Sequence, residues 1–236
     1  MNNKVGVYIC ELIGTFALCF IGILAIKHLG GVPGGLIGIA LAHGLILAIM
    51  ISITGATSGG HLNPAVTLGL LSGGKISVVE ALAYIVAQCA GGVLAGLAVM
   101  AIYGTGGADI VNLGTPTILN SVTKLTLLTP GGAFLAEAIA TFFLVFAVWG
   151  TAVDPRAPKI GGFGIGLSVT AGILAIGPLT GGALNPARAF GPAIAATLGG
   201  AHYDWANMWI YWAGPVVGGV LASLIYKNFI YPKKAA

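Results

Sequence analysis

The chain has 236 residues, of which 57% are hydrophobic and only 7% are charged, and its mean hydropathy is +1.00. Soluble domains carry about 25% charged residues, so this composition excludes an ordinary soluble domain and predicts a protein that crosses a membrane several times. No polar linker or change of composition divides the chain, so we expect a single domain over residues 1–236.

Six apolar stretches are long enough to span a bilayer, which takes about 20 helical residues. In chain order they are Val5–Ile26, Leu36–Gly55, Val78–Tyr103, Ala133–Val153, Gly161–Pro178 and Ala206–Phe229. The first stretch lacks a small-residue cleavage site followed by a polar start, which favours a transmembrane helix over a signal peptide. An even number of spans places both termini on one side of the membrane.

Positive side chains predict which side this is, because cytoplasmic loops carry an excess of Lys and Arg. The side of the termini holds Lys4, Lys75, Arg156, Lys159, Lys227, Lys233 and Lys234, and the other side holds Lys27, Lys124 and Arg188. We therefore expect an integral membrane protein with both termini in the cytoplasm. The short terminal tails favour a prokaryotic plasma (inner) membrane.

Three cysteines, Cys10, Cys19 and Cys89, lie inside apolar runs. An odd number of them at such places indicates small buried side chains, and neither a disulfide framework nor a metal site. The net charge of +4 is explained by the loops and does not indicate nucleic-acid binding. We expect no cofactor, no metal and no nucleic-acid partner, and a lipid bilayer around the chain.

The two halves of the chain repeat one another. Glu11–Phe16 matches Glu137–Phe142 at an offset of 126, and Gly91–Leu97 matches Gly218–Leu224 at an offset of 127. These matches predict repeats over approximately 5–103 and 131–230. Each repeat has three spans, and an odd number of spans forces the two units into opposite orientations.

Two further segments are short helix starts. Asn63-Pro64-Ala65 and Asn185-Pro186-Ala187 lie 122 positions apart, and each follows a glycine-rich stretch. Asn is a preferred N-cap and Pro is preferred at the first helical position. About ten apolar residues follow each motif, and they would span about 15 Å, half of the hydrocarbon core.

These half-helices decide the fold class. Irregular backbone at membrane depth is tolerated only where protein buries it or where it lines a water-filled cavity. We therefore predict an all-α membrane protein of six transmembrane helices plus two re-entrant half-helices in an inverted repeat, with Asn63 and Asn185 meeting near the midplane. As caps, their side-chain carbonyls would face their own helices, which leaves the amide NH₂ groups to donate into a lumen.

Arg188 lies three residues after Asn185, in the first turn of the second half-helix. A cation there opposes the helix dipole, and a charge inside a membrane is costly unless it faces a cavity. A purely structural role would need a buried carboxylate, and none lies nearby in sequence. The position therefore predicts that Arg188 faces the lumen.

The backbone before each motif supplies further candidate pore groups, because glycine accepts lumen-lining backbone with positive φ. The expected acceptor carbonyls belong to Gly59, Gly60, His61, Gly181, Gly182 and Ala183. His61 lacks partners for a metal site, so we expect it beside the vestibule. Glu11 and Glu137 are intramembrane carboxyl groups, for which we favour hydrogen bonding to the re-entrant loops over a proton relay.

The motifs together resemble the aquaporins of the major intrinsic protein family. The resemblance rests on Gly59–Thr67, on Asn185–Ala193, on the Glu-x-x-x-Thr-Phe starts of the first and fourth spans, and on Ala87-Gln88. It covers essentially the whole chain and implies a homotetramer in which every subunit has its own pore. It also implies that half-helix dipoles exclude cations, which is the established account of aquaporin-type pores.

The resemblance further implies an outer selectivity ring that contains Arg188. The matching positions are His43, Ile173 and Gly182, which lie 20 residues before Asn63 and 12 and three residues before Asn185. This quartet is similar to one in plant vacuolar-membrane aquaporins and departs from the common water-specific pattern. Ile173 and Gly182 should leave more room and fewer donors.

The implied function is a passive transmembrane water channel that excludes protons and ions, with ammonia and other small neutral solutes as further candidate permeants. A channel chiefly for glycerol is an alternative, although Ala189 stands where glycerol-conducting members have Asp. A secondary transporter is a remote alternative, since transporters also use inverted repeats and broken helices. An enzyme is not expected, because the chain offers no nucleophile–base set.

Overall fold

The computed structural model describes residues 4–104, 114–118, 128–158 and 160–232, and this part of the chain is helical with no strand. Six of its helices are long and apolar enough to cross a membrane. They are α1 (Lys4–Leu29), α2 (Gly35–Ser58), α4 (Val78–Tyr103), α6 (Pro130–Val148) with the π-helical turn η2 (Trp149–Val153), α7 (Phe163–Thr180), and α9 (Met208–Ile225) between the short helices η3 (Trp205–Asn207) and η4 (Tyr226–Ile230). The six predicted spans are confirmed, with their ends shifted by a few residues except at Val78–Tyr103.

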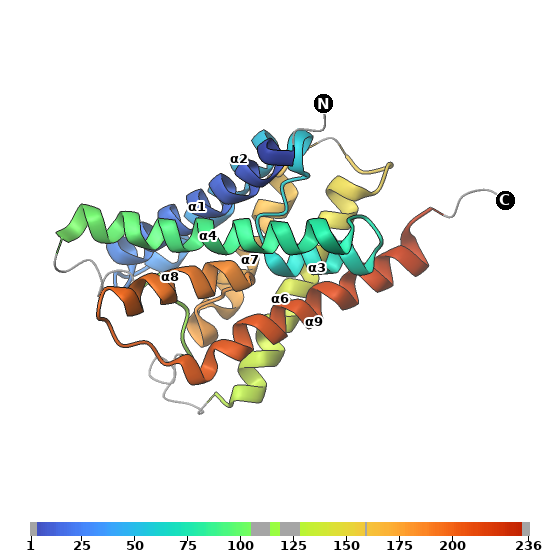
Figure 1. Cartoon of the computed structure of the whole chain (residues 1–236). Coiled ribbons are helices and arrows are strands. Elements are labelled where there is room, and N and C mark those ends of the chain that lie inside the picture. Colours follow the sequence, from blue (N-terminus) through green and yellow to red (C-terminus); the bar gives the residue numbers. More distant parts are fainter. Residues whose placement is uncertain (1–3, 105–113, 119–127, 159, 233–236) are drawn as a thin grey trace.

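The two half-helices are also present. They are α3 (Pro64–Ser72, 9 residues) and α8 (Pro186–Leu198, 13 residues), which correspond to about 14 and 20 Å of helix. Both pack against α4 and α9, and Figure 1 shows them between these long helices, α3 in cyan and α8 in orange. Neither is long enough to cross the hydrocarbon core of about 30 Å.

Glycines bring the long helices into close contact in matching pairs. A Cβ atom on Gly91 in α4 would collide with the Leu12 carbonyl oxygen of α1, and one on Gly218 in α9 would collide with the Ala138 carbonyl oxygen of α6. Small residues allow this approach of membrane helices. The α1–α4 and α6–α9 pairs therefore have the same construction in the two halves.

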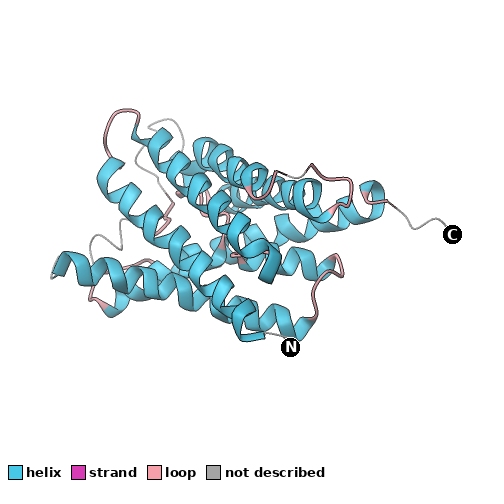
Figure 2. Cartoon of the chain, turned by 90° about the horizontal axis from the view of Figure 1, so that it is seen from above, coloured by secondary structure: helices cyan, strands magenta, loops and turns pink. Residues whose placement is uncertain are grey.

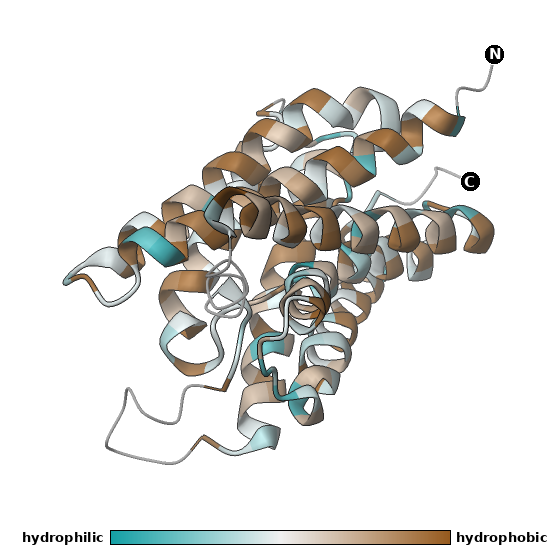
Figure 3. Cartoon of the chain, turned by 60° about the vertical axis from the view of Figure 1, so that its left-hand side comes forward, coloured by the Kyte–Doolittle hydropathy of each residue, from teal (hydrophilic) through white to brown (hydrophobic). Residues whose placement is uncertain are grey.

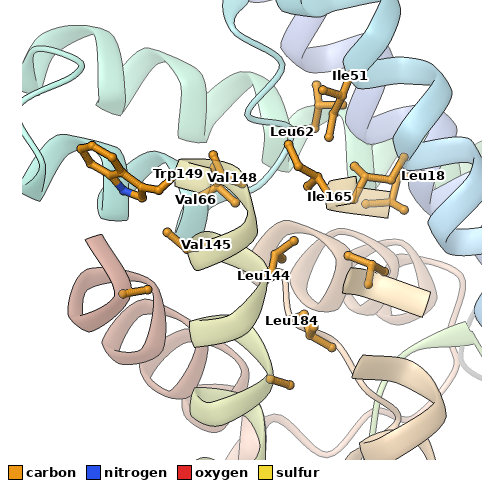
Figure 4. Packing of buried hydrophobic residues seen from close by; sticks show 14 of the residues in the cluster. Leu18, Ile51, Leu62, Val66, Leu144, Val145, Val148, Trp149, Ile165 and Leu184 are labelled. Carbon is orange, nitrogen blue, oxygen red and sulfur yellow. The ribbon is translucent and has the colours of Figure 1, made fainter. Parts of the chain in front are cut away.

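Apolar side chains fill the interior and also cover the outside. Leu62, Leu144 and Leu184 belong to one buried cluster at the centre of the bundle (Figure 4). On the outer surface Val79 is 77% exposed and Phe229 is 83% exposed, and the ribbons are largely brown along their length (Figure 3). An apolar surface of this kind suits lipid and not water.

The start of α1 and the end of α9 lie at the same end of the bundle (Figure 1), and loops lie both at the ends of the bundle and in its interior (Figure 2). Two of the positive residues expected on this side are anchored there, because Lys75 bonds to Tyr231 and Arg156 bonds to the Ile230 carbonyl oxygen. Lys124, Lys159, Lys233 and Lys234 lie outside the described residues.

Candidate pore between the half-helices

The two Asn-Pro-Ala motifs meet tip to tip. Asn63 Oδ1 accepts from Ala65 N at 2.8 Å, and Asn185 Oδ1 accepts from Ala187 N at 3.0 Å, so each Asn caps its own half-helix. Each side chain also reaches across to the other loop. Asn63 Nδ2 donates to the Leu184 carbonyl at 2.8 Å, and Asn185 Nδ2 donates to the Leu62 carbonyl at 2.9 Å.

These crossed hydrogen bonds add to what the capping pattern predicts. The sequence predicts that the amide NH₂ groups are left to donate into a lumen, and the structure uses one hydrogen of each NH₂ to tie Asn63 and Asn185 to the opposite loop. An amide NH₂ has two donors, so one hydrogen of each Asn remains. The tips are therefore fixed to each other as well as to their own helices.

Leu62 and Leu184 have backbone conformations that the sequence pattern does not predict. Their φ angles are 50° and 52°, the only positive values among the described non-glycine residues. This left-handed conformation is unfavourable for a residue with a Cβ atom, and here it belongs to the residues whose carbonyls receive the crossed bonds. A signal existed in the sequence, because Leu precedes Asn in both motifs.

A buried carboxyl group holds each of these loops. Glu11 Oε1 accepts from His61 N at 3.0 Å and from Ser58 Oγ at 2.7 Å, and Glu11 Oε2 accepts from Leu62 N at 2.6 Å and from Gln88 Nε2 at 2.7 Å. Four donors thus converge on one carboxyl group that is 0% exposed. These include the loop N–H groups that the sequence leads us to expect as partners.

Glu137 makes the equivalent contacts in the second half. It accepts from Thr180 Oγ1 at 2.7 Å, from Ala183 N at 2.9 Å and from Leu184 N at 2.8 Å. Tyr211 completes this loop by donating to the Thr180 carbonyl at 2.9 Å. Tyr84 does the same in the first half, where it donates to the Ser58 carbonyl at 2.8 Å.

Three cavities run through this region, and neighbouring cavities share lining residues. A larger vestibule of about 690 Å³ includes His61 and Asn63 in its walls, and a smaller vestibule of about 430 Å³ includes Ile173 and Arg188. Between them lies a narrow cavity of about 10 Å³, on the order of the space that one water needs. Asn63 also lines this narrow cavity, and so do Ile173 and Arg188, so the narrow cavity adjoins both vestibules.

The narrow cavity brings together most of the predicted pore side chains. Its walls include Asn63, Asn185, His43, Ile173 and Arg188. Gly182 is not among the lining residues of any of the three cavities; it packs against Ile173, and a Cβ atom there would lie 3.2 Å from Ile173 Cα. The absence of a side chain at position 182 therefore allows Ile173 to approach the loop.

Arg188 and His43 each keep an unpaired nitrogen in this region. Arg188 Nη1 donates to the Gly114 carbonyl at 2.8 Å, and His43 Nδ1 lies 2.8 Å from the Ile39 carbonyl. Arg188 Nε and His43 Nε2 are buried without a hydrogen-bond partner among the described residues. Because a carbonyl only accepts, His43 Nδ1 carries the hydrogen, and Nε2 of the neutral ring is an acceptor.

Five of the six predicted backbone acceptors belong to residues that line the cavities, the exception being Gly182. Gly59, Gly60 and His61 line the larger vestibule, Gly181 lines the smaller one, and Ala183 lines the narrow cavity. The φ angles of Gly59, Gly60, Gly181 and Gly182 are 84°, 62°, 83° and 59°. Side chains are disfavoured at such angles, which explains glycine at these four positions.

Comparison with known proteins decides the family. A family model described as Major intrinsic protein matches residues 2–226. The chain belongs to the major intrinsic protein family. Among its relatives, Aquaporin TIP2-2 of Zea mays is 42% identical over 234 residues, which cover 95% of this chain and 87% of the relative. Probable aquaporin TIP3-2 of Arabidopsis thaliana is 42% identical over 239 residues, covering 95% and 83%.

A solved structure agrees with this assignment. The aquaglyceroporin from Plasmodium falciparum superposes on this major intrinsic protein with a TM-score of 0.85 and 26% identity, and the match covers 97% of both chains. The arrangement of six spans and two half-helices is therefore that of a known channel fold.

Proposed function

We propose that the chain forms a passive transmembrane channel for water, and that it is not an enzyme. The observation that carries the proposal is the path between Asn63 and Asn185, where two vestibules are joined by a cavity of about 10 Å³. A passage of that size admits water in single file. The aquaporin names of its relatives support the same function.

The same residues would exclude ions and protons. Both half-helices present their N-terminal ends to the passage, and such an end carries about half a positive charge. Each Asn retains one amide hydrogen while its Oδ1 caps its own half-helix, so a water between the two side chains finds donors and no acceptor on either Asn to continue a proton wire. Arg188 adds a full positive charge beside the narrow cavity, which opposes the entry of cations.

We propose His43, Ile173, Gly182 and Arg188 as the selectivity ring. Ile173 contributes an apolar wall, and the polar contacts would come from the unpaired nitrogens of His43 and Arg188. A ring with one apolar side and few donors suits ammonia as well as water. Glycerol conduction is the second candidate, because the similar solved structure is an aquaglyceroporin, but the small volume of the narrow cavity favours water.

Vesicle swelling and shrinkage test this function. Proteoliposomes holding the protein should respond to an osmotic step several times faster than empty vesicles, and ion gradients should not change the rate. His43→Phe should narrow the ring, reducing ammonia flux more than water flux, while Val79→Ala on the exposed face of α4 should change neither. Water flux that requires an ion gradient would instead indicate a secondary transporter, and no flux above empty vesicles would refute the channel.

Structural roles follow for the remaining predicted residues. We assign Glu11 and Glu137 to the support of the re-entrant loops, because each accepts hydrogen bonds from two loop N–H groups. The carbonyls of Gly59, Gly60, His61, Gly181 and Ala183, whose residues line the cavities, would serve as acceptors for passing water, whereas Gly182 lines none of the three. A proton relay would need an acidic or basic side chain bonded directly to each Glu, and the described donors to Glu11 and Glu137 are backbone N–H, hydroxyl and amide groups.

The wider setting is also part of the proposal. We expect single-domain subunits with inverted repeats over approximately 5–103 and 131–230, assembled as a homotetramer in the lipid bilayer with both termini in the cytoplasm. Mass measurement of the detergent-solubilised protein tests the tetramer. The prediction of a prokaryotic plasma membrane gains no support, because the similar aquaporins named above come from plants.

A further inference from the structure

A polar network lies beside the larger vestibule, at His61, Thr67 and Gln88. Gln88 is 0% exposed, and its Nε2 donates to Glu11 Oε2 at 2.7 Å and to Thr67 Oγ1 at 3.0 Å. A carboxylate oxygen only accepts, so the nitrogen of the Gln88 amide must face Glu11. Both amide hydrogens of Gln88 are then used, one on Glu11 and one on Thr67.

The Thr67 hydroxyl in turn determines which ring nitrogen of His61 carries the hydrogen. Thr67 Oγ1 donates its single hydrogen to the Asn63 carbonyl at 3.0 Å, and His61 Nδ1 lies 3.1 Å from the same oxygen. Since the hydroxyl has no second hydrogen, His61 Nδ1 must be the donor. The neutral imidazole then has its lone pair on Nε2, which makes Nε2 an acceptor.

His61 Nε2 is free to meet water. The side chain lines the larger vestibule, and no hydrogen bond joins Nε2 to another residue in the described part of the chain. The ring is held in place by an edge contact with Tyr84, with centroids 5.0 Å apart, and the His61 backbone N–H is held by Glu11. An oriented acceptor therefore stands in the vestibule two residues before Asn63.

We propose that Thr67 and Gln88 are positioning residues that fix His61 as a hydrogen-bond acceptor at this mouth of the narrow passage. The proposal rests on the water-channel function above. A water at this mouth donates a hydrogen to His61 Nε2 and turns its oxygen toward the free amide hydrogen of Asn63. His61 and Asn63 thus favour one orientation of the entering water. In the other His61 tautomer both Nε2 and the Asn63 amide would be donors, and this orientation would be lost.

Nitrogen-15 NMR of labelled histidine in proteoliposomes tests the proposal at mildly alkaline pH, where imidazole is neutral. The His61 signal, identified by its loss in His61→Gln, should show hydrogen on Nδ1. Thr67→Val keeps the side-chain shape but removes the acceptor, so the hydrogen should move to Nε2 and water permeability should fall about fivefold, the equivalent of one hydrogen bond. Gln88→Met should give a mixture of tautomers and a smaller loss.

Thr15→Val is the matched control, because Thr15 makes the same kind of bond to the carbonyl four residues earlier in α1 and does not touch His61. It should leave the tautomer and the permeability unchanged. The proposal is overturned if the wild-type hydrogen is on Nε2, or if Thr67→Val lowers permeability without moving the hydrogen, which would indicate a merely structural role. A wild type that conducts no water would refute the channel function instead, and the tautomer would still decide the network.

Discussion

The first and second halves of the molecule build the same scaffold with nearly the same parts. Glu11 and Glu137 hold the loops, and Tyr84 and Tyr211 donate to the carbonyls that end α2 and α7. The hydroxyl group that donates to each carboxyl group belongs to Ser58 in one half and to Thr180 in the other. Gln88 is a further difference, because it donates to Glu11 and no equivalent side chain is among the described donors to Glu137.

The halves differ where side chains reach the passage. At the offset of 122, His61 and Thr67 correspond to Ala183 and Ala189, and Val66 corresponds to Arg188. One half therefore presents an acceptor to its vestibule and the other presents a cationic donor to the narrow cavity. The comparison teaches that two halves can share one scaffold while a few cavity-lining positions make them chemically different.

The strongest test removes the carboxyl groups from both halves. Glu137→Ala leaves the buried N–H groups of Ala183 and Leu184 unpaired, at about 1–3 kcal/mol each, and should destabilise the protein by roughly 4 kcal/mol. Glu11→Ala should cost at least as much, because Gln88 also loses its partner. Thermal unfolding in detergent measures both effects.

Glu80→Ala is the control for this pair, since Glu80 is an exposed carboxylate whose loss removes only a capping box at the start of α4, about 1 kcal/mol. If Glu137→Ala unfolds at the same temperature as Glu80→Ala, Glu137 does not support its loop as Glu11 does. The scaffolds of the first and second halves are then not equivalent.

The glycine contacts provide the next largest effect. Gly91→Ala and Gly218→Ala each place a methyl group against a backbone carbonyl of the neighbouring helix, and overpacking of this kind costs about 3 kcal/mol. The two variants should lose similar amounts of thermal stability. Gly55→Ala in α2, where a Cβ atom meets nothing within 4 Å, should lose none; unequal effects of the first two would indicate that only one half packs as described.

Much of the fold could be predicted because the membrane imposes simple rules. Span length and the Asn-Pro-Ala starts lead directly to the six helices and to α3 and α8. The last turns of the transmembrane helices were less predictable. Residues Trp149–Val153 and Tyr226–Ile230 form π-helical turns, and hydropathy does not distinguish such turns from ordinary helix.

The site could be predicted less fully, because sequence spacing indicates which residues meet but not how their hydrogens are shared. Asn63, Asn185 and Arg188 follow from helix capping and from the cost of a buried charge. The crossed bonds to Leu62 and Leu184 depend on left-handed backbone that glycine-based reasoning does not assign to leucine. The Gly114 carbonyl, which accepts a hydrogen bond from Arg188, belongs to a residue 74 positions away in the chain. No local sequence pattern indicates that pairing.

A smaller effect is expected at the tyrosines. Tyr84→Phe and Tyr211→Phe each remove one buried hydrogen bond to a carbonyl, worth about 1 kcal/mol, while the ring packing stays. Equal losses in thermal stability would sharpen the equivalence of the halves. A larger loss for Tyr84→Phe would instead show that its edge contact with His61 depends on the hydroxyl anchor.

The smallest effect lies at the helix ends, where the halves use different pairs. At the end of α1, His28 lies 3.0 Å from the Tyr103 hydroxyl, while after α6 Asp154 accepts from Arg156 and Tyr226. Hydrogen bonds from the Arg156 guanidinium hold the pKa of Asp154 well below its ordinary value of 3.8.

Because the folded pKa of Asp154 is lowered, its stabilising contribution is fully present above the ordinary value and is lost as the pH falls toward the folded pKa. Arg156 is largely exposed, with 58% of its side chain accessible, so solvent screens the pair and the contribution is modest. Wild type should unfold at a slightly higher temperature than Asp154→Asn at neutral pH, and the gap should close only in strong acid. If the difference in unfolding temperature between wild type and Asp154→Asn instead widens on acidification, the charge of Asp154 does not stabilise the end of α6. The two halves would then stabilise these helix ends by the same kind of neutral hydrogen bond.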